Sequence, residues 1–354
     1  MKKNKGLIKF FVNFLIFTLV IWSLIGVSIP LMIDPVSHYV YTDSDWNGFS
    51  YVPEYNHSDW NVLLDPHSHT YYSDGDLSPR QNLLWHMTMG FNAMVLTDHN
   101  TFEGIEEIKQ IARTEFNDSI KVLAGMEWTT DRLHMNIILP PTVTAEEYET
   151  LATFNSYSYT PTDEEIQEII TSTHALGGII MVNHILWSED YCFNQPTREQ
   201  LYIWGIDYIE VVNEEVFDNE SYYFCLDNGL GMLASTDMHI PEPVYAWTTL
   251  NTTEFTEEAI FAQLQARQTG ILFDGIASPY PIEHEINPGY IALLPLIRFG
   301  EIFRSMYSSG MLGTQLTILF AYFYGIFFLV EGIRALVKKI IQIVRTKKTE
   351  KRIE

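Results

Sequence analysis

Two long uncharged segments, one near each end of the chain, most constrain what this sequence can form. Residues 10–33 hold no Asp, Glu, Lys or Arg over 24 positions, and residues 305–330 form a second stretch without charge. As a helix rising about 1.5 Å per residue, the first segment would extend about 36 Å, which is enough to cross a bilayer core of about 30 Å. The sequence therefore predicts a chain anchored in a membrane by two helices.

Each segment has an alternative interpretation. The first could be a cleaved signal peptide, but the apolar region of a signal is usually about 7–15 residues long, and no A-x-A-like cleavage site follows here. The second could be a buried core helix. The basic residues that follow it, from Arg334 to Lys348, are instead typical of a helix that stops at the cytoplasmic face. Two spanning helices explain both segments best.

Charged residues are sorted along the chain in the same pattern. Residues 1–33 carry four Lys and no acid, residues 298–354 carry 10 basic and 4 acidic residues, and residues 34–297 hold the remaining 7 basic and 41 acidic residues. The positive-inside rule places both termini in the cytoplasm and, with two spans, the middle of the chain outside the cell. A net charge of −34 in that middle argues against a nucleic-acid partner, because binding phosphates needs clustered Lys and Arg.

The two segments divide the chain into six parts. These are a basic end with the first transmembrane helix at 1–33, a linker at 34–59, the main domain at 60–285, an interfacial segment at 286–309, the second transmembrane helix at 310–337 and a basic cytoplasmic tail at 338–354. We expect Pro288 and Pro295 to break any long helix in the interfacial segment.

Composition excludes two classes of protein. Hydrophobic residues make up 47% of the chain, which is enough for a sizeable core and excludes wholesale disorder. Only two cysteines are present, so a disulfide-built scaffold and a Cys-rich zinc module are excluded. Whether Cys192 and Cys225 pair with each other stays open.

The middle of the chain alternates short apolar runs with amphipathic stretches. The apolar runs predict strands at 61–67, 92–99, 121–128, 134–140, 177–184, 205–213 and 230–239. Capping signals predict helix starts between them, at Ser78 followed by Pro79, at Thr162 followed by three acidic residues, and at Thr256 followed by two glutamates. This alternation predicts an α/β barrel or an open α/β sheet.

Nearly every strand-like run ends in a His, Asp or Glu residue. In α/β barrels the carboxyl ends of the strands meet at one mouth, so we expect these side chains to converge there. His67 and His69 are two residues apart, as are Asp237 and His239, which places each pair on one side of an extended chain. Imidazole and carboxylate together suit Zn, Mn or Fe, so the cluster predicts a divalent metal site. Packing or surface roles are expected for His38, His57, His86, His174 and His284.

Two segments, LLDPHSHTYYSDGDLSP and GFNAMVLTDHNTFEG, resemble the opening of the polymerase and histidinol phosphatase (PHP) domain. That family shows an H-x-H-[ST] motif, then Ser-Asp-Gly, Thr-Asp-His, a Glu, an isolated His, an Ala-His-Pro-like turn and a final Ser-Asp-x-His. Over about residues 60–275 all nine ligand positions of the family are filled in order, by His67, His69, Asp74, His99, Glu127, His134, His184, Asp237 and His239.

The resemblance implies a distorted (β/α)7 barrel of the PHP type, flanked by the two transmembrane helices, with up to three divalent metal ions at its mouth. It implies one ion held by His67, His69, Glu127 and Asp237, a second held by Glu127, His134 and His184, and a third held by Asp74, His99 and His239. The chain departs from the family at 183–185, where Asn-His-Ile replaces Ala-His-Pro, and at 268–270, where Gln-Thr-Gly replaces the usual Gly-Arg.

Three further residues are candidates for the site. Asp65 and Asp98 adjoin predicted ligands in the sequence and could orient their imidazoles, although each could also be a turn or cap residue. Arg267 is the candidate for a substrate contact, in place of the family's missing arginine.

The predicted function is hydrolysis of a phosphate ester by a metal-activated water, in a domain outside the cell membrane. The expected partners are a small phosphorylated substrate or a phosphate-containing polymer, and the lipid bilayer. Two alternatives stay open: a metal-dependent amidohydrolase-like enzyme acting on a carbonyl substrate, and a non-catalytic anchored binding module. Aromatic-rich loops at 154–161, 215–224 and 241–249 are expected to line the mouth and select the substrate.

Overall fold

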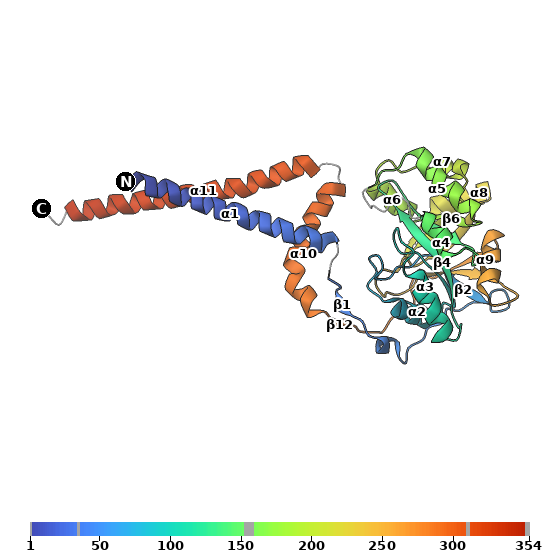
Figure 1. The fold of residues 1–354 in the computed structure, drawn as a ribbon. Coiled ribbons are helices and arrows are strands. Elements are labelled where there is room, and N and C mark those ends of the chain that lie inside the picture. Colours follow the sequence, from blue (N-terminus) through green and yellow to red (C-terminus); the bar gives the residue numbers. More distant parts are fainter. Residues whose placement is uncertain (1, 34–35, 152–158, 309–311, 351–354) are drawn as a thin grey trace. The chain divides into compact units, whose positions relative to one another are not determined.

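The computed structural model describes residues 2–33, 36–151, 159–308 and 312–350 (Figure 1). The chain divides into two compact units, which are Met1–His38 with Ile286–Glu354, and Tyr39–Glu285. Long helices form the described part of the first unit, whereas helices and strands together form the second.

The first unit contains three helices, α1 (Lys2–Ile33), α10 (Pro288–Ser308) and α11 (Leu312–Glu350). α1 and α11 run antiparallel. The Asn13 amide donates a hydrogen bond to Glu331 at 3.0 Å, and one to two turns further along α1 the Tyr324 hydroxyl donates to Thr18 at 3.3 Å. Aromatic side chains of the two helices pack between these polar contacts, for example Phe17 against Phe327 with ring centroids 5.0 Å apart.

Two stretches of these helices are long and apolar enough to cross a bilayer. They are Gly6–Leu31 and Leu312–Lys348, whose 18-residue apolar windows have mean hydropathies of 2.4 and 1.9. Both are compatible with the membrane spans predicted from the sequence.

The prediction that Pro288 and Pro295 break the segment between them is wrong, because α10 contains both. Pro288 is its first residue, where the missing N–H removes no helical hydrogen bond. Pro295 lies inside the helix, and the residues beyond it are held by packing, since Phe299 and Phe303 lie in one apolar cluster with Ile25 of α1. Tertiary packing of this kind sustains a helix that local propensity alone would not.

The second unit is built on a ten-stranded sheet. Its strands are β2 (Val62–Asp65), β3 (Ala93–Leu96), β4 (Lys121–Thr129), β5 (His134–Leu139), β6 (Ile179–Val182), β7 (Tyr208–Asn213), β8 (Val216–Phe217), β9 (Gly231–Ser235), β10 (Ala246–Leu250) and β11 (Gly270–Phe273). β1 (Tyr39–Val40) and β12 (Glu285–Ile286) form a separate two-stranded sheet. The helices are α2 (Pro79–Thr88), α3 (Ile105–Thr114), α4 (Ala145–Tyr148), α5 (Asp163–Ala175), α6 (Ile185–Tyr191), α7 (Arg198–Trp204), α8 (Asn219–Asn228) and α9 (Glu257–Gln265), with 3₁₀ turns η1 (Asp43–Trp46) and η2 (Glu149–Leu151).

The sheet is curled into a half-barrel and mixed in direction. Its order is β11-β10-β2-β3-β4-β5-β6-β7-β8, with β9 paired to β7. β2, β3, β4, β6, β7, β9 and β11 run one way, whereas β5, β8 and β10 run the other way. The predicted α/β class is confirmed, but the regular alternation of a (β/α)7 barrel is not, because a short turn rather than a helix joins β4 to the antiparallel β5.

The predicted helix starts are confirmed. Ser78 caps α2 by accepting a hydrogen bond from the Gln81 N–H, with Pro79 as the first helical residue. Thr162 caps α5 and Thr256 caps α9 in the same way. These side chains satisfy backbone donors that have no partner within the helix.

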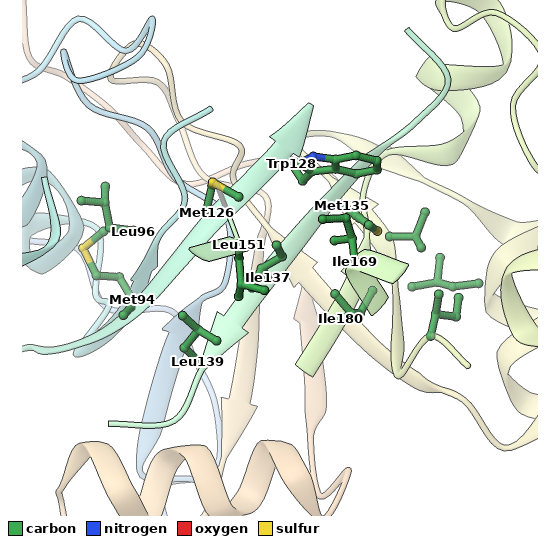
Figure 2. Close-up of a cluster of buried hydrophobic side chains, with 14 of the residues drawn as sticks. Met94, Leu96, Met126, Trp128, Met135, Ile137, Leu139, Leu151, Ile169 and Ile180 are labelled. Carbon is green, nitrogen blue, oxygen red and sulfur yellow. The ribbon is translucent and has the colours of Figure 1, made fainter. Parts of the chain in front are cut away.

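Strict alternation along the central strands divides the apolar side chains between two faces of the sheet. Figure 2 shows one cluster, in which Met126 and Trp128 of β4 and Ile137 of β5 lie near Ile169 of α5. The residues between them point to the opposite face. There Leu123 and Ile138 pack with Val95, Tyr208 and Leu264 of α9 in a second apolar cluster. Because the period is two, Glu127 lies on the same face as Leu123, four residues further towards the end of β4.

Residues 39–59, which the sequence assigns to a linker, belong to the second unit. Trp46 is only 4% exposed and packs in an apolar cluster with Trp85 and Trp247. Asp45 accepts a hydrogen bond from His284 at 3.0 Å. Burial of a large aromatic side chain favours this packing over a solvated linker.

Both cysteines are free thiols. Cys225 lies on α8 and is fully buried, whereas Cys192 directly follows α6. Burial raises the pKa of the Cys225 thiol to about 12, so it stays protonated at neutral pH.

A substitution at Gly231 can test how closely this residue packs against Tyr208. A Cβ at this position would overlap the ring of Tyr208, which is fully buried. We expect Gly231→Ala to destabilise the second unit by about 1–3 kcal/mol, measured by chemical denaturation of the full chain. Gly275→Ala is the control, because a Cβ there meets nothing within 4 Å, and it should leave the midpoint unchanged. Equal midpoints for the two variants would contradict this packing.

Candidate metal centre

The nine candidate ligands meet at the edge of the sheet where β2, β3, β4, β6, β7 and β9 end. Their ligand atoms form four groups, and within each group the atoms lie no more than 4.8 Å apart. The groups are His67, His69 and Asp237; His67, Glu127 and His184; His99, Glu127 and His134; and His69, Asp74, His99 and His239. Because the groups share members, the nine residues form one continuous cluster.

His134 reaches this edge because its strand is reversed. It is the first residue of β5, and its partner across the antiparallel ladder is Thr129, the last residue of β4. The sequence predicts that the candidate ligands lie at the carboxyl ends of strands, whereas His134 lies at the amino end of β5.

Glu127 lies at the centre of the cluster and is fully buried. Its two carboxylate oxygens face different imidazoles. Oε1 lies 3.1 Å from His134 Nδ1 and 3.2 Å from His184 Nε2, and Oε2 lies 2.7 Å from His99 Nδ1, 3.4 Å from His67 Nε2 and 3.5 Å from His69 Nε2. Burial by itself would raise the pKa of Glu127, but the neighbouring imidazoles lower it well below its usual value. The carboxylate is therefore ionised.

Asp237 and His184 both adopt left-handed backbone conformations, with φ of 50° and 25°. Hydrogen bonds hold them there: the Asp237 N–H donates to the His67 carbonyl at 3.0 Å, and the His184 N–H donates to Glu210 at 2.6 Å. In this position Asp237 Oδ1 lies 3.1 Å from Nε2 of both His67 and His69. Such conformations are costly for non-glycine residues and persist where the surroundings fix them, often at functional sites.

Asp74 closes the side of the cluster that is open to solvent. Its Oδ1 lies 3.4 Å from His99 Nε2 and 3.3 Å from His239 Nε2, and its side chain is 43% exposed. His69 lies behind this group. Burial and the neighbouring imidazoles of His239 and His99 lower the pKa of His69 to about 3, so its ring is neutral and offers a lone pair.

The donor set fits divalent metal ions. His67 Nε2 and Glu127 Oε2 are buried. Both lie at ion-pair distance from neighbouring groups, but within the described residues neither makes a hydrogen bond with suitable angles, which is costly unless a cation lies between such groups. Burial would lower the pKa of His67, but the carboxylates of Asp237, Glu127 and Glu210 raise it well above its usual value. The cluster thus attracts positive charge, which a metal ion can supply in place of a proton.

Glu210 belongs to the site, although the sequence did not indicate it. It lies in β7, is 1% exposed, and its carboxylate accepts a hydrogen bond from His67 Nδ1 at 2.9 Å. It also accepts from the Ser235 hydroxyl and from the Asn213 amide at 3.1 Å. An acid inside an apolar run is the one signal that could have identified it, because buried carboxylates need partners. Glu210 fixes which ring nitrogen of His67 faces the cluster.

Asp65 and Asp98 support the loops of the site rather than its imidazoles. Asp65 bonds His86 at 3.0 Å and accepts from the Thr236 N–H at 3.1 Å. Asp98 accepts from both the N–H and the hydroxyl of Thr70 at 2.7 Å. Asp65 also accepts a hydrogen bond from the backbone N–H of His67 at 3.3 Å, but among the described residues neither aspartate bonds the imidazole of a candidate ligand. The physical reason is that backbone N–H groups of the strand-end loops lie closer to them.

Arg267 does not lie at the cluster. Its guanidinium pairs with Asp207 at 3.2 Å and donates to the Gly229 carbonyl at 3.1 Å. Asp207 immediately precedes β7, so Arg267 lies at the amino ends of the strands, opposite the candidate ligands. The structure therefore does not bring Arg267 together with the candidate ligands, as its predicted contact with substrate would require.

A cavity of about 330 Å³ lies beside Asp237 and His239. Glu214, Glu215 and Glu242 line it, so two of the predicted mouth loops each contribute to its wall. Those ranges are partly regular structure, because 219–224 lie in α8 and 246–249 in β10. Of the third loop, residues 154–158 lie outside the described residues.

Comparison with known proteins supports the resemblance seen in the sequence. Residues 65–217 match the family model of the PHP domain, which confirms that resemblance over this range. No curated protein matches the chain.

Three solved structures show low overall similarity to the chain. A two-domain protein from Bacteroides vulgatus that contains a predicted PHP-like metal-dependent phosphoesterase is 22% identical, with a TM-score of 0.49, over 64% of this chain and 68% of that one. A putative metal-dependent phosphoesterase from Bifidobacterium adolescentis is 16% identical, with a TM-score of 0.40, over 58% and 96%. An amidohydrolase from Chromobacterium violaceum, with bound sulfate and no metal, is 16% identical, with a TM-score of 0.37, over 59% and 97%.

The contact between Glu210 and His67 predicts an effect on metal affinity. Glu210→Gln keeps the shape of the side chain but weakens its hold on His67, so we expect zinc affinity to fall about 10–100-fold, measured by competition with a chromophoric chelator. Glu215→Gln is the matched control, because Glu215 is exposed and outside the donor groups. Unchanged affinity in a folded Glu210→Gln protein would show that this carboxylate does not orient the ligand.

Proposed function

We propose that the second unit is a metal-dependent phosphoesterase and that α1 and α11 anchor it in a membrane. The observation that carries the proposal is the convergence of six imidazoles and three carboxylates at one edge of the sheet. The match of residues 65–217 to the PHP domain supports the same assignment.

The resemblance to the PHP domain assigns the nine residues to three sets, two of which share Glu127. His67, His69, Glu127 and Asp237 would hold one ion, Glu127, His134 and His184 a second, and Asp74, His99 and His239 a third. The opposite orientations of the two Glu127 oxygens support a bridging role between the first two sets. Bound divalent ions would lower the pKa of a water and offset the negative charge of a phosphate ester.

The charges around the cluster support an essential role for metal in binding phosphate. Within the described residues, every ion pair made by Asp74, Glu127 or Asp237 is with a histidine, and none is with Lys or Arg. The side chains of the site therefore carry no permanent positive charge. The chain's own contribution is to fix the donors: Glu210 orients His67, and the Asn183 amide donates to Glu127 Oε1 at 2.9 Å.

The same proposal places residues 34–297 outside the cell and both termini in the cytoplasm. The two apolar helices and the basic residues beyond the second support this topology. The substrate would be a small phosphorylated molecule or a phosphate-containing polymer on the outer side of the membrane.

Loss of the central carboxylate should abolish phosphoester hydrolysis. Glu127→Gln removes a charge that faces five imidazoles, so we expect turnover of an aryl phosphate to fall to the level of the buffer control. Chelation of wild-type protein should have the same effect, reversed by Zn, Mn or Fe. His174→Gln is the control, because His174 pairs with Asp207 away from the cluster and should retain activity. Metal-loaded wild-type protein that hydrolyses no monoester or diester would refute the proposal.

The topology is testable with single cysteines in a Cys192→Ser, Cys225→Ser background. Ile276→Cys reports on the second unit, where this position is 91% exposed, and Lys347→Cys reports on the end of α11. In right-side-out vesicles a membrane-impermeant maleimide should label the first at once and the second only after detergent is added. Immediate labelling of Lys347→Cys would contradict the proposed orientation.

A further inference from the structure

An exposed tryptophan lies directly beside the candidate metal centre. α6 begins at the residue after His184 and carries Trp187 on its first turn. The indole ring lies 5.1 Å from the ring of His184 and 5.3 Å from the ring of His134, between ring centroids. Trp187 is therefore in contact range of any group that extends from a phosphate bound at these imidazoles.

Trp187 lies on a face of α6 that does not pack against the core. Ile185 and Ser188 are buried and fix the helix to the domain. Trp187 and Tyr191 are four residues apart and so share another face, where they are 46% and 57% exposed. Their rings stack with centroids 4.9 Å apart and an interplanar angle of 29°. Tyr191 thus supports one side of the indole and leaves nearly half of Trp187 open to solvent.

We propose that Trp187, supported by Tyr191, stacks against a ring in the organic part of the substrate. The ester would then carry a sugar ring or a nucleobase next to its phosphate, not an open chain. This inference rests on the proposed phosphoesterase function and adds a substrate class to it. Trp187 acts as a specificity-determining residue, because it contacts the organic group and not the reacting atoms.

The chemistry of the surface favours a ring over a lipid. Flat aromatic faces stack on flat ligand faces, and a stacked pair of aromatic side chains offers a large contact area at low conformational cost. Asp190 lies exposed on the same helix and would repel an anionic bilayer surface. Exposed aromatics beside a polar centre are more consistent with a bound ring than with insertion into a membrane.

Three phosphonates with the same number of carbon atoms test the proposal without requiring turnover. Phenylphosphonate presents an aromatic face, cyclohexylphosphonate a saturated ring, and n-hexylphosphonate an open chain. We expect zinc-loaded wild-type full-length protein to bind at least one cyclic compound about fivefold to tenfold more tightly than the open chain, measured by calorimetry. Preference for the phenyl compound points to a nucleobase, and preference for the cyclohexyl compound points to a sugar. Equal Kd values for all three overturn the proposal.

Variants then test whether Trp187 is responsible for the preference for cyclic phosphonates. Trp187→Ala should remove it and Trp187→Phe should retain most of it for the phenyl compound. Phe255→Ala should leave it unchanged, because Phe255 is an exposed aromatic beside Lys121 at the amino end of β4, away from the candidate ligands. Because Trp187 adjoins His184, bound zinc is measured in each variant. Tyr191→Ala, further from the ligands, should weaken ring binding with full zinc content. Ring preference that survives in zinc-loaded Trp187→Ala protein overturns the assignment.

The two proposals fail in different ways. Metal-dependent phosphoester hydrolysis without any ring preference would reject the stacking role alone. Ring-selective, Trp187-dependent phosphonate binding in a protein that hydrolyses no phosphoester would reject the enzymatic proposal and leave the ring-binding site standing.

Discussion

A buried carboxylate surrounded by imidazoles is the constraint on which the second unit depends. Glu127 has no exposed surface, and five histidines from four separate parts of the chain face its two oxygens. An isolated ionised carboxylate at this depth would be strongly unfavourable. The strand ends must therefore be held within hydrogen-bond range of one another, and the surrounding polar contacts, including those of Glu210 and Asn183, do this.

Along the same strands of the curled sheet, apolar side chains form the core and polar side chains at the strand ends form the candidate metal centre. On the inner face of β4, Leu123 packs against apolar neighbours while Glu127, two alternations further, reaches the cluster. β7 repeats this order with Tyr208 and Glu210. α9 packs at the amino ends through Leu264, which accepts a hydrogen bond from the Tyr208 hydroxyl at 2.6 Å. Apolar contacts thus dominate the inner face towards the amino ends, while the candidate ligands lie at the carboxyl edge.

Much of the candidate site could be predicted from the sequence because its signals are local. The spacing of His67 and His69 and the family motifs identified all nine donors that the structure brings together. Glu210 was missed, because its one signal is an acid within the apolar run of β7, and its contact with His67 is between residues far apart in the chain. Arg267 was misplaced because sequence order says nothing about which end of a strand a residue adjoins, and it lies at the amino ends. The sequence also could not show that Trp46, in the predicted linker at 34–59, packs against distant tryptophans.

The sequence by itself determined the α/β class, the helix starts and the two apolar helices, because these follow from hydrophobic period and capping within a few residues. Its resemblance to the PHP domain indicated the nine candidate ligands. Only the tertiary structure decided which donors face one another, that a reversed β5 presents His134 by its first residue, that Pro295 lies within a helix, and that Trp187 stands beside the cluster. These features depend on contacts between residues far apart in the chain, whose energies no local pattern contains.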